Sequence, residues 1–132
     1  MAIPAQSVSG SEVLRRENIE SLSNTTTAFR FDTQHPATNN STYTVPANHI
    51  ITILSIVICE QSNATRNFTI YINNSHGSLP QINIFEQQDV GAYQTFVIAD
   101  KIVLIGGDNL KINGGGSSNF DVLYTYVDQN WS

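Results

Sequence analysis

The sequence is short of cysteine, of charge and of long apolar runs, and each shortage argues against a class of protein. Its single cysteine, Cys59, excludes an internal disulfide and a multi-cysteine metal cluster. Only 13% of the 132 residues are charged, against about 25% in an average soluble domain. The net charge of −5 argues against the basic surface that nucleic-acid binding requires. No apolar run approaches the roughly 20 residues of a membrane-spanning helix.

Residues that are β-branched or polar without charge make up much of the chain. Isoleucine and valine total 24, whereas leucine and alanine total 15, and this balance favours strands over helices. Asparagine, serine and threonine total 39, so uncharged polar groups must coat the surface. With 40% hydrophobic residues the chain is not disordered. The composition therefore predicts a single acidic, all-β domain.

The scarce charges are concentrated near the N-terminus. Five of the 17 charged residues (six basic and eleven acidic) lie within residues 11–20. Ser9 and Glu12 have the spacing of a capping box, which predicts a short helix over about 11–22. The apolar positions of this segment form a ragged stripe rather than a clean helical face. An extended arm that lies on a neighbouring molecule is the alternative.

Both interpretations set residues 1–24 apart as an attachment segment, followed by a β-sandwich domain over residues 25–132. Arginines are frequent interface anchors because a guanidinium binds a carboxylate through two hydrogen bonds. The alternative for Arg15 and Arg16 is a solvated helix face paired with nearby glutamates. A tryptophan near a chain end tends to be anchored against its own domain or against a neighbour. We expect interface contacts from Ile3, Val8, Val13, Leu14, Arg15, Arg16 and Trp131.

From about Thr26 the hydrophobic pattern changes to a period of two, which predicts strands. Residues 49–60 form the longest apolar run, and half of its residues are isoleucine or valine. Such a run predicts a central strand covered on both faces, within which Cys59 packs as a small hydrophobic residue. About nine short strands separated by turn residues predict an antiparallel β-sandwich with a jelly-roll-like arrangement.

The alternation along these strands assigns one face of each to the core. The residues expected to be buried are Phe29, Phe31, Val45, Ile51, Ile53, Ile56, Ile58, Phe68, Ile70, Ile72, Phe96, Ile98, Val103, Ile105, Leu110, Ile112, Val122 and Tyr124.

The sequence contains no legible arrangement of catalytic or metal-binding residues. The histidines His35, His49 and His76 are scattered, and no zinc-binding spacing connects them. The glycine clusters at 106–107 and 114–116 match neither the dinucleotide-binding nor the phosphate-loop pattern. Aspartates beyond the N-terminal segment fall in predicted turns and strand ends, where they are common. We expect a protein that is not an enzyme and that uses no metal or cofactor.

Three segments resemble the small β-sandwich virion proteins of tailed bacteriophages. Tyr43–Cys59 reads YTVPANHIITILSIVIC and is similar to their Y-T-V-P-A-x-K-x-x-x-I-x-S-I-x-V-C-N pattern. Ile105–Ile112 resembles their L-x-x-G-D-x-L-x-V hairpin, and Val122–Val127 resembles their closing V-x-x-S-Y-x-E strand. The resemblance extends over roughly residues 42–128.

Two departures from that pattern stand out. Asn48-His49 replaces the usual Gly-Lys turn, and Glu60-Gln61 replaces the asparagine that follows the cysteine.

The resemblance implies a structural role in a virion, with no catalytic residues. Head decoration proteins and neck, tail or fibre components share this pattern. We favour a capsid decoration or cement protein that binds the major capsid protein, or other virion proteins, through its N-terminal segment. The resemblance also favours a homo-oligomer, with a trimer preferred. The first residues lack the basic and apolar regions of a signal peptide, so we expect synthesis in the host cytoplasm and residence in the virion.

A carbohydrate-binding, lectin-like module is the alternative from another class of function. Such a module would bind a host glycan through exposed aromatic residues with aspartate or asparagine partners. The candidates are Tyr93, Trp131 and the loops around Asn74 and Gly115. Neither nucleic acid nor a membrane is expected as a partner.

Overall fold

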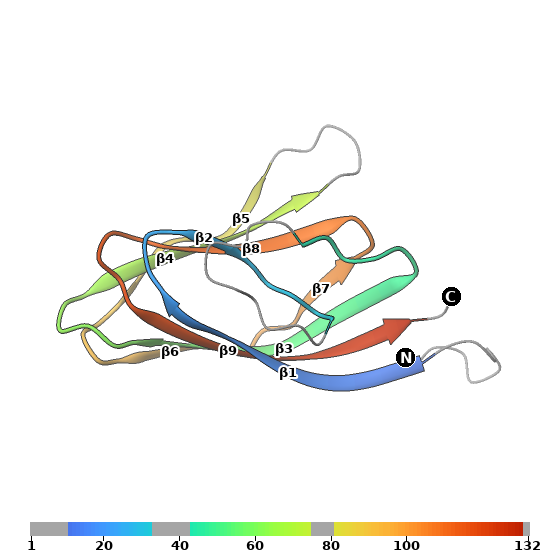
Figure 1. Ribbon diagram of the computed structural model, residues 1–132, viewed down its shortest axis with the longest axis horizontal. Coiled ribbons are helices and arrows are strands. Elements are labelled where there is room, and N and C mark those ends of the chain that lie inside the picture. Colours follow the sequence, from blue (N-terminus) through green and yellow to red (C-terminus); the bar gives the residue numbers. More distant parts are fainter. Residues whose placement is uncertain (1–10, 33–42, 75–80, 131–132) are drawn as a thin grey trace.

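The computed structural model describes residues 11–32, 43–74 and 81–130, which form an antiparallel β-sandwich (Figure 1). This confirms the fold class predicted from the β-branched composition and the period-two patterns. The described residues contain nine strands, which are β1 (Ser11–Leu22), β2 (Thr26–Ala28), β3 (His49–Glu60), β4 (Arg66–Asn74), β5 (Ile82–Val90), β6 (Thr95–Ile98), β7 (Ile102–Ile105), β8 (Asp108–Gly114) and β9 (Phe120–Asn130).

The strands are divided between two sheets that lie face to face (Figure 1). The first, sheet A, has the order β1-β9-β3-β6, and β7 also pairs with β3. The second, sheet B, has the order β2-β8-β4-β5. The chain crosses repeatedly from one sheet to the other, and this connectivity is the jelly-roll-like arrangement that was expected.

Residues 11–22 are a strand, and the short helix predicted there is wrong. β1 pairs with β9 from Ser11 opposite Asn130 to Leu22 opposite Phe120. Ile19 and Leu22 are fully buried in the core, so β1 is an integral strand of the sandwich. The division between residues 1–24 and 25–132 stays a prediction, because residues 1–10 lie outside the described residues. Burial of alternate side chains and pairing with β9 outweigh a local capping motif, because helix propensity is a weak preference.

β3 has the bounds that its apolar run predicts, and it is central in sheet A, with β9 on one side and β6 and β7 on the other. Ile51, Ile53, Ile56 and Ile58 on its inner face are fully buried. The outer face of β3 is only half-buried, and Cys59 lies on it. The part of the chain that the structure describes thus covers one face of β3, and within it the expectations of two covered faces and of a core Cys59 are wrong.

Most residues expected in the core are buried, and Ile72 and Phe96 pack partly buried against it. The expectation that Val103 and Ile105 are buried is wrong, because both side chains are about half exposed. In the pairing of β7 with β3, Leu104 lies opposite the buried Ile51, and Leu104 is the buried residue of that strand. A one-residue difference in register exchanges the two faces of a strand.

Candidate functional site

The outer face of sheet A is apolar, although it is turned away from the core. Leu14 on β1 lies opposite Val127 on β9, and Thr52 on β3 lies between Val127 and Val103 of β7. Paired residues in neighbouring strands point to the same side of a sheet, so these four side chains form one row across sheet A. Leu14 is 66% exposed and Val103 is 57% exposed.

A second row crosses the same face further along the strands. Asn18, Leu123, Val57 and Val97 are successive partners on β1, β9, β3 and β6. Val97 is 56% exposed and Leu123 is 39% exposed. We call this surface the apolar face, and its members are Leu14, Ile50, Val57, Val97, Val103, Ile105, Leu123 and Val127.

The charged residues on the outer face of sheet A lie on β1 and at one end of β9. Arg16 lies between the two apolar rows, opposite Thr125, and the next residue across is Ser55. Asp121 of β9 accepts hydrogen bonds from the backbone N–H of Ser21 at 3.0 Å and from Nε2 of Gln61. The carboxylate of Asp121 is therefore hydrogen-bonded within its own chain. The centre of the face, where Thr125 and Ser55 lie, is uncharged.

The outer face of sheet B is polar, in contrast. Thr26, Asn113 and Thr69 form one of its rows, and Nδ2 of Asn113 donates to Oγ1 of Thr26 at 2.8 Å. Lys111 and Tyr71 are paired in the next row. The same sandwich therefore presents one face suited to water and one suited to contact with protein.

A shallow, open hollow of about 380 Å³ lies at one end of the apolar face. Its lining includes Asn18, Val57, Cys59, Asp121 and Leu123. Cys59 is a free cysteine. The lining has two carboxylates: Asp121 accepts hydrogen bonds from Ser21 and Gln61, and Glu20 accepts one from Nδ2 of Asn18 at 3.4 Å. The hollow is a shallow depression in the apolar face, and it is lined by Val57 and Leu123 of that face.

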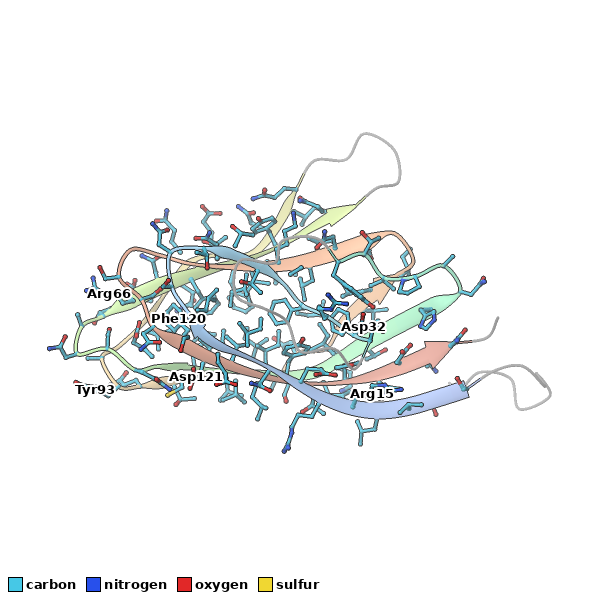
Figure 2. All side chains as sticks on the ribbon, viewed as in Figure 1. Arg15, Asp32, Arg66, Tyr93, Phe120 and Asp121 are labelled. Carbon is cyan, nitrogen blue, oxygen red and sulfur yellow. The ribbon has the colours of Figure 1, made fainter. Side chains whose placement is uncertain are left out.

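The residues predicted at an interface divide between the two sides of β1. Leu14 and Arg16 point outward with the apolar face, whereas Val13 and Arg15 are paired with Asp128 and Tyr126 on the inner side. Figure 2 shows Arg15 on β1. Ile3, Val8 and Trp131 lie outside the described residues.

The sequence analysis did not indicate that Val57, Val97, Val103 and Leu123 belong to the apolar face. The sequence of β3 contains a signal for part of this surface, because the strand has apolar residues on its outer face, Ile50 and Val57, as well as on its inner face.

A cluster of aromatic and polar side chains fills the space between the sheets near β1 and β9. The hydroxyl of Tyr124 donates to the carbonyl oxygen of Arg30 at 2.8 Å and accepts from the N–H of Arg30 at 3.1 Å. The Arg30 guanidinium lies 5.4 Å from the ring centroid of Tyr43 and pairs with Asp32 at 2.5 Å. Burial raises the pKa of Tyr43 to about 12 and also raises the pKa of Tyr124 and Tyr126. These contacts fasten the segment after β2 to β9, so their role is structural.

The described histidine, His49, is part of a structural pair. Its Nδ1 lies 2.8 Å from Oδ1 of Asp128, across the pairing of β3 with β9. His35 and His76 lie outside the described residues. Within residues 11–32, 43–74 and 81–130, no group of three histidine, cysteine, aspartate or glutamate side chains is arranged to hold a metal ion. The same residues include no helix long and apolar enough to cross a membrane.

The candidates for glycan binding do not converge on one place. Tyr93, in the turn between β5 and β6, is 70% exposed and lies at one tip of the molecule (Figure 2). The N–H of Gly115 donates to Asn67 near the start of β4 at 2.8 Å, whereas Asn74 ends β4. The seven residue steps from Asn67 to Asn74 along β4 span roughly 23 Å. Asn74 and Gly115 therefore lie at opposite ends of the sandwich. Trp131 lies outside the described residues.

Comparisons with known proteins identify similar folds only. No family model matches the sequence, and no curated protein matches it significantly. A subunit of the disulfide-linked pili of Bacillus endospore appendages is 10% identical, with a TM-score of 0.49 over 100% of this chain and 99% of the pilus chain.

Two further solved structures are similar at the same low level. The globular domain of zebrafish complement 1qA protein is 11% identical, with a TM-score of 0.45 over 89% of this chain and 94% of the other. A chain of infectious bursal disease virus, Gx strain, is 12% identical, with a TM-score of 0.36 over 89% of this chain and 36% of the other.

Proposed function

We propose that this chain is a structural protein of a bacteriophage virion, a β-sandwich that works by contact with other proteins and has no enzymatic activity. The observation that carries the proposal is the apolar face of sheet A, where rows of leucine and valine remain exposed. Contiguous exposed apolar patches mark sites of protein–protein contact. The described polar side chains that lie close together serve the fold, as Tyr124 with Arg30 and His49 with Asp128 do.

Within that role we favour a decoration or cement protein of the capsid, on the strength of the sequence resemblance. Its partner is then the major capsid protein, its location the virion, and its state a homo-oligomer for which the resemblance favours a trimer. The structure narrows the segment that we propose for attachment. Because Ile19 and Leu22 belong to the core, we assign attachment to residues 1–10, the part of the segment that precedes β1. A neck, tail or fibre component is the alternative location.

The test is to locate the chain on particles. Virions purified on a density gradient from the producing cells are expected to contain the chain in a fixed ratio to the major shell protein. Gold-labelled antibodies against the chain distinguish head, neck and tail by electron microscopy. A chain that stays in the soluble fraction of lysates that yield complete particles contradicts the proposal.

A deletion tests the attachment segment. A variant without residues 1–10 keeps every core residue of β1, and we expect it to fold with unchanged circular dichroism but to be lost from the particles. A variant in which the same ten residues are replaced by a glycine-serine stretch controls for length. Undiminished binding of both variants contradicts attachment through this segment.

A further inference from the structure

We propose that a second copy of this chain packs on the apolar face of sheet A. The inference rests on the proposed function for its biological setting and goes beyond it by naming the occupant of this surface. Attachment to a capsid through residues 1–10 assigns no role to this face. The inference thus concerns the free protein in solution as well as the particle.

The first support is the composition of β3. A strand with apolar residues on both faces is typical of burial on both sides, and β3 has isoleucines on its inner face and Ile50, Leu54 and Val57 among its remaining positions. The inner face is covered by sheet B, while the outer face is only half-buried. No strand of residues 11–32, 43–74 and 81–130 packs on that outer face, and we assign its cover to another molecule.

The second support is the size of the surface. Four strand positions about 4.8 Å apart and ten residues of about 3.3 Å each span roughly 19 by 33 Å, or about 600 Å², before the relief of the side chains is added. Standard protein–protein interfaces bury about 800 Å² on each partner. Stable interfaces range from about 600 to 1,000 Å² on each partner, so the outer face of sheet A reaches the lower end of that range. Its uncharged centre has the composition of an interface core.

The third support is charge complementarity between the two edges of this face. Arg16 lies on the β1 edge, in the row of Thr125 and Ser55. On the opposite edge, the connection between β6 and β7 contains the exposed Asp100, and it lies between the pairs Ile56–Ile98 and Ile53–Ile102. Asp100 thus stands at the same level along the strands as Arg16, with β9 and β3 between them.

That placement favours a second copy over another partner. A copy turned about a two-fold axis parallel to the strands brings its β1 over the β6–β7 edge of the first, and this contact makes a dimer in place of the trimer that the resemblance favours. Arg16 of each copy then lies near Asp100 of the other, and the apolar rows meet between them. Opposite charges at the rim fix the register of an interface.

The central experiment compares two apolar-to-glutamate changes of equal exposure. Val103→Glu places a charge in the apolar face, and Ile82→Glu places one on β5 of the other sheet; the two side chains are 57% and 53% exposed. We expect the full chain to have a mass of twice the 14.5 kDa of one chain by light scattering or sedimentation. Val103→Glu is expected to raise the dissociation constant at least about tenfold, while Ile82→Glu leaves it unchanged.

Two further measurements keep the proposal falsifiable should Val103→Glu fail to fold. Leu14→Glu, at a 66% exposed position of the edge strand, is expected to have the same effect. Arg16→Glu and Asp100→Arg should each weaken association, and mixing the two variants in equal amounts should restore it. The thiol of Cys59 on the same face should react with a maleimide more slowly in the assembled protein than in the Leu14→Glu monomer.

The outcomes separate this inference from the proposed function. A wild-type chain that stays monomeric up to about 100 μM, or assembly unaffected by both Val103→Glu and Leu14→Glu, overturns the second copy and leaves the virion role standing if particles still contain the chain. Self-association through this face by a chain that no particle contains overturns the virion role alone. Association lost equally in the Ile82→Glu control also overturns the assignment to this face.

Discussion

Tyr124 and Tyr126 are neighbours on the inner face of β9, and both are fully buried, yet their hydroxyl groups have different surroundings. The Tyr124 hydroxyl satisfies both the N–H and the carbonyl oxygen of Arg30. The Tyr126 hydroxyl has no hydrogen-bond partner among the described residues. Their rings lie 6.0 Å apart, so the two positions differ mainly in hydrogen bonding.

This difference makes a matched pair of variants. Tyr124→Phe leaves two backbone groups without partners, and we expect the free energy of unfolding to fall by about 1–3 kcal/mol. Tyr126→Phe removes an unpaired hydroxyl, and the free energy of unfolding should stay within about 0.5 kcal/mol or rise. Urea denaturation of the two variants checks the comparison. Equal losses in both contradict it.

Tyr93 stores backbone strain at a turn. Its φ is 57°, a left-handed conformation that costs most residues about 1–2 kcal/mol and that asparagine tolerates. The side chain is 70% exposed, so its replacement loses little packing.

We expect Tyr93→Asn to raise the free energy of unfolding by about 0.5–1 kcal/mol. Tyr71→Asn on β4 is the control, and it should be destabilising because Tyr71 is half-buried in a regular strand. Thermal denaturation measures both. A lower melting temperature for Tyr93→Asn than for the wild type would show that the tyrosine side chain contributes more than the strain costs.

At the scale of elements, β3 and β9 depend on a buried carboxylate where β3 ends. Glu60 is completely buried, and its Oε1 accepts the N–H of Ser62 at 2.9 Å and the N–H of Asn119 at 3.2 Å. One side chain thereby holds both the turn after β3 and the loop before β9. Its Oε2 has no partner among the described groups.

Glu60→Ala is expected to lower the free energy of unfolding by about 2 kcal/mol or more, because two N–H groups lose their acceptor. Glu60→Gln keeps an acceptor oxygen in place and should recover most of that loss. Chemical denaturation compares the two, and hydrogen exchange at Ser62 and Asn119 should become faster only in Glu60→Ala. Equal stability of the alanine and glutamine variants would exclude this role for the carboxylate.

At the scale of the whole molecule, the tyrosine cluster predicts a loss of stability in alkali. Burial raises the pKa of Tyr43 from 10.0 to about 12, and it raises the pKa of Tyr124 and Tyr126 in the same direction. Above pH 10 the unfolded chain loses these protons while the folded protein keeps them. The contribution of these groups is fully present below pH 10 and is lost as the pH rises from 10 towards 12 and beyond.

The slope of this loss is at most about 1.4 kcal/mol per pH unit for each tyrosine. Urea denaturation at pH 8, 10 and 11 measures it, and Tyr126→Phe should make the decline shallower by one tyrosine. The absorbance of tyrosinate gives an independent titration of the folded protein. Stability that is unchanged between pH 9 and pH 11.5 contradicts the burial of these hydroxyls.

The sequence by itself determined the strands from β3 onward and most of the core. The period-two alternation of Phe68 and Ile70, or of Val122 and Tyr124, marks an inner face wherever the strand lies. The apolar run that became β3 matches its bounds at both ends. For the candidate surface the sequence indicated only Leu14 and Arg16, because a pattern within one strand does not reveal its neighbours.

Only the tertiary structure decided the role of residues 11–22, the register of β7 and the covering of β3. β1 is a strand because β9 supplies its hydrogen bonds and the core takes Ile19 and Leu22. Val103 and Ile105 point outward because Leu104, and not either of them, lies opposite Ile51. All three depend on pairing between segments far apart in the chain, and local periodicity does not contain that information. The apolar outer face of sheet A arises in the same way, from the alignment of side chains on five strands.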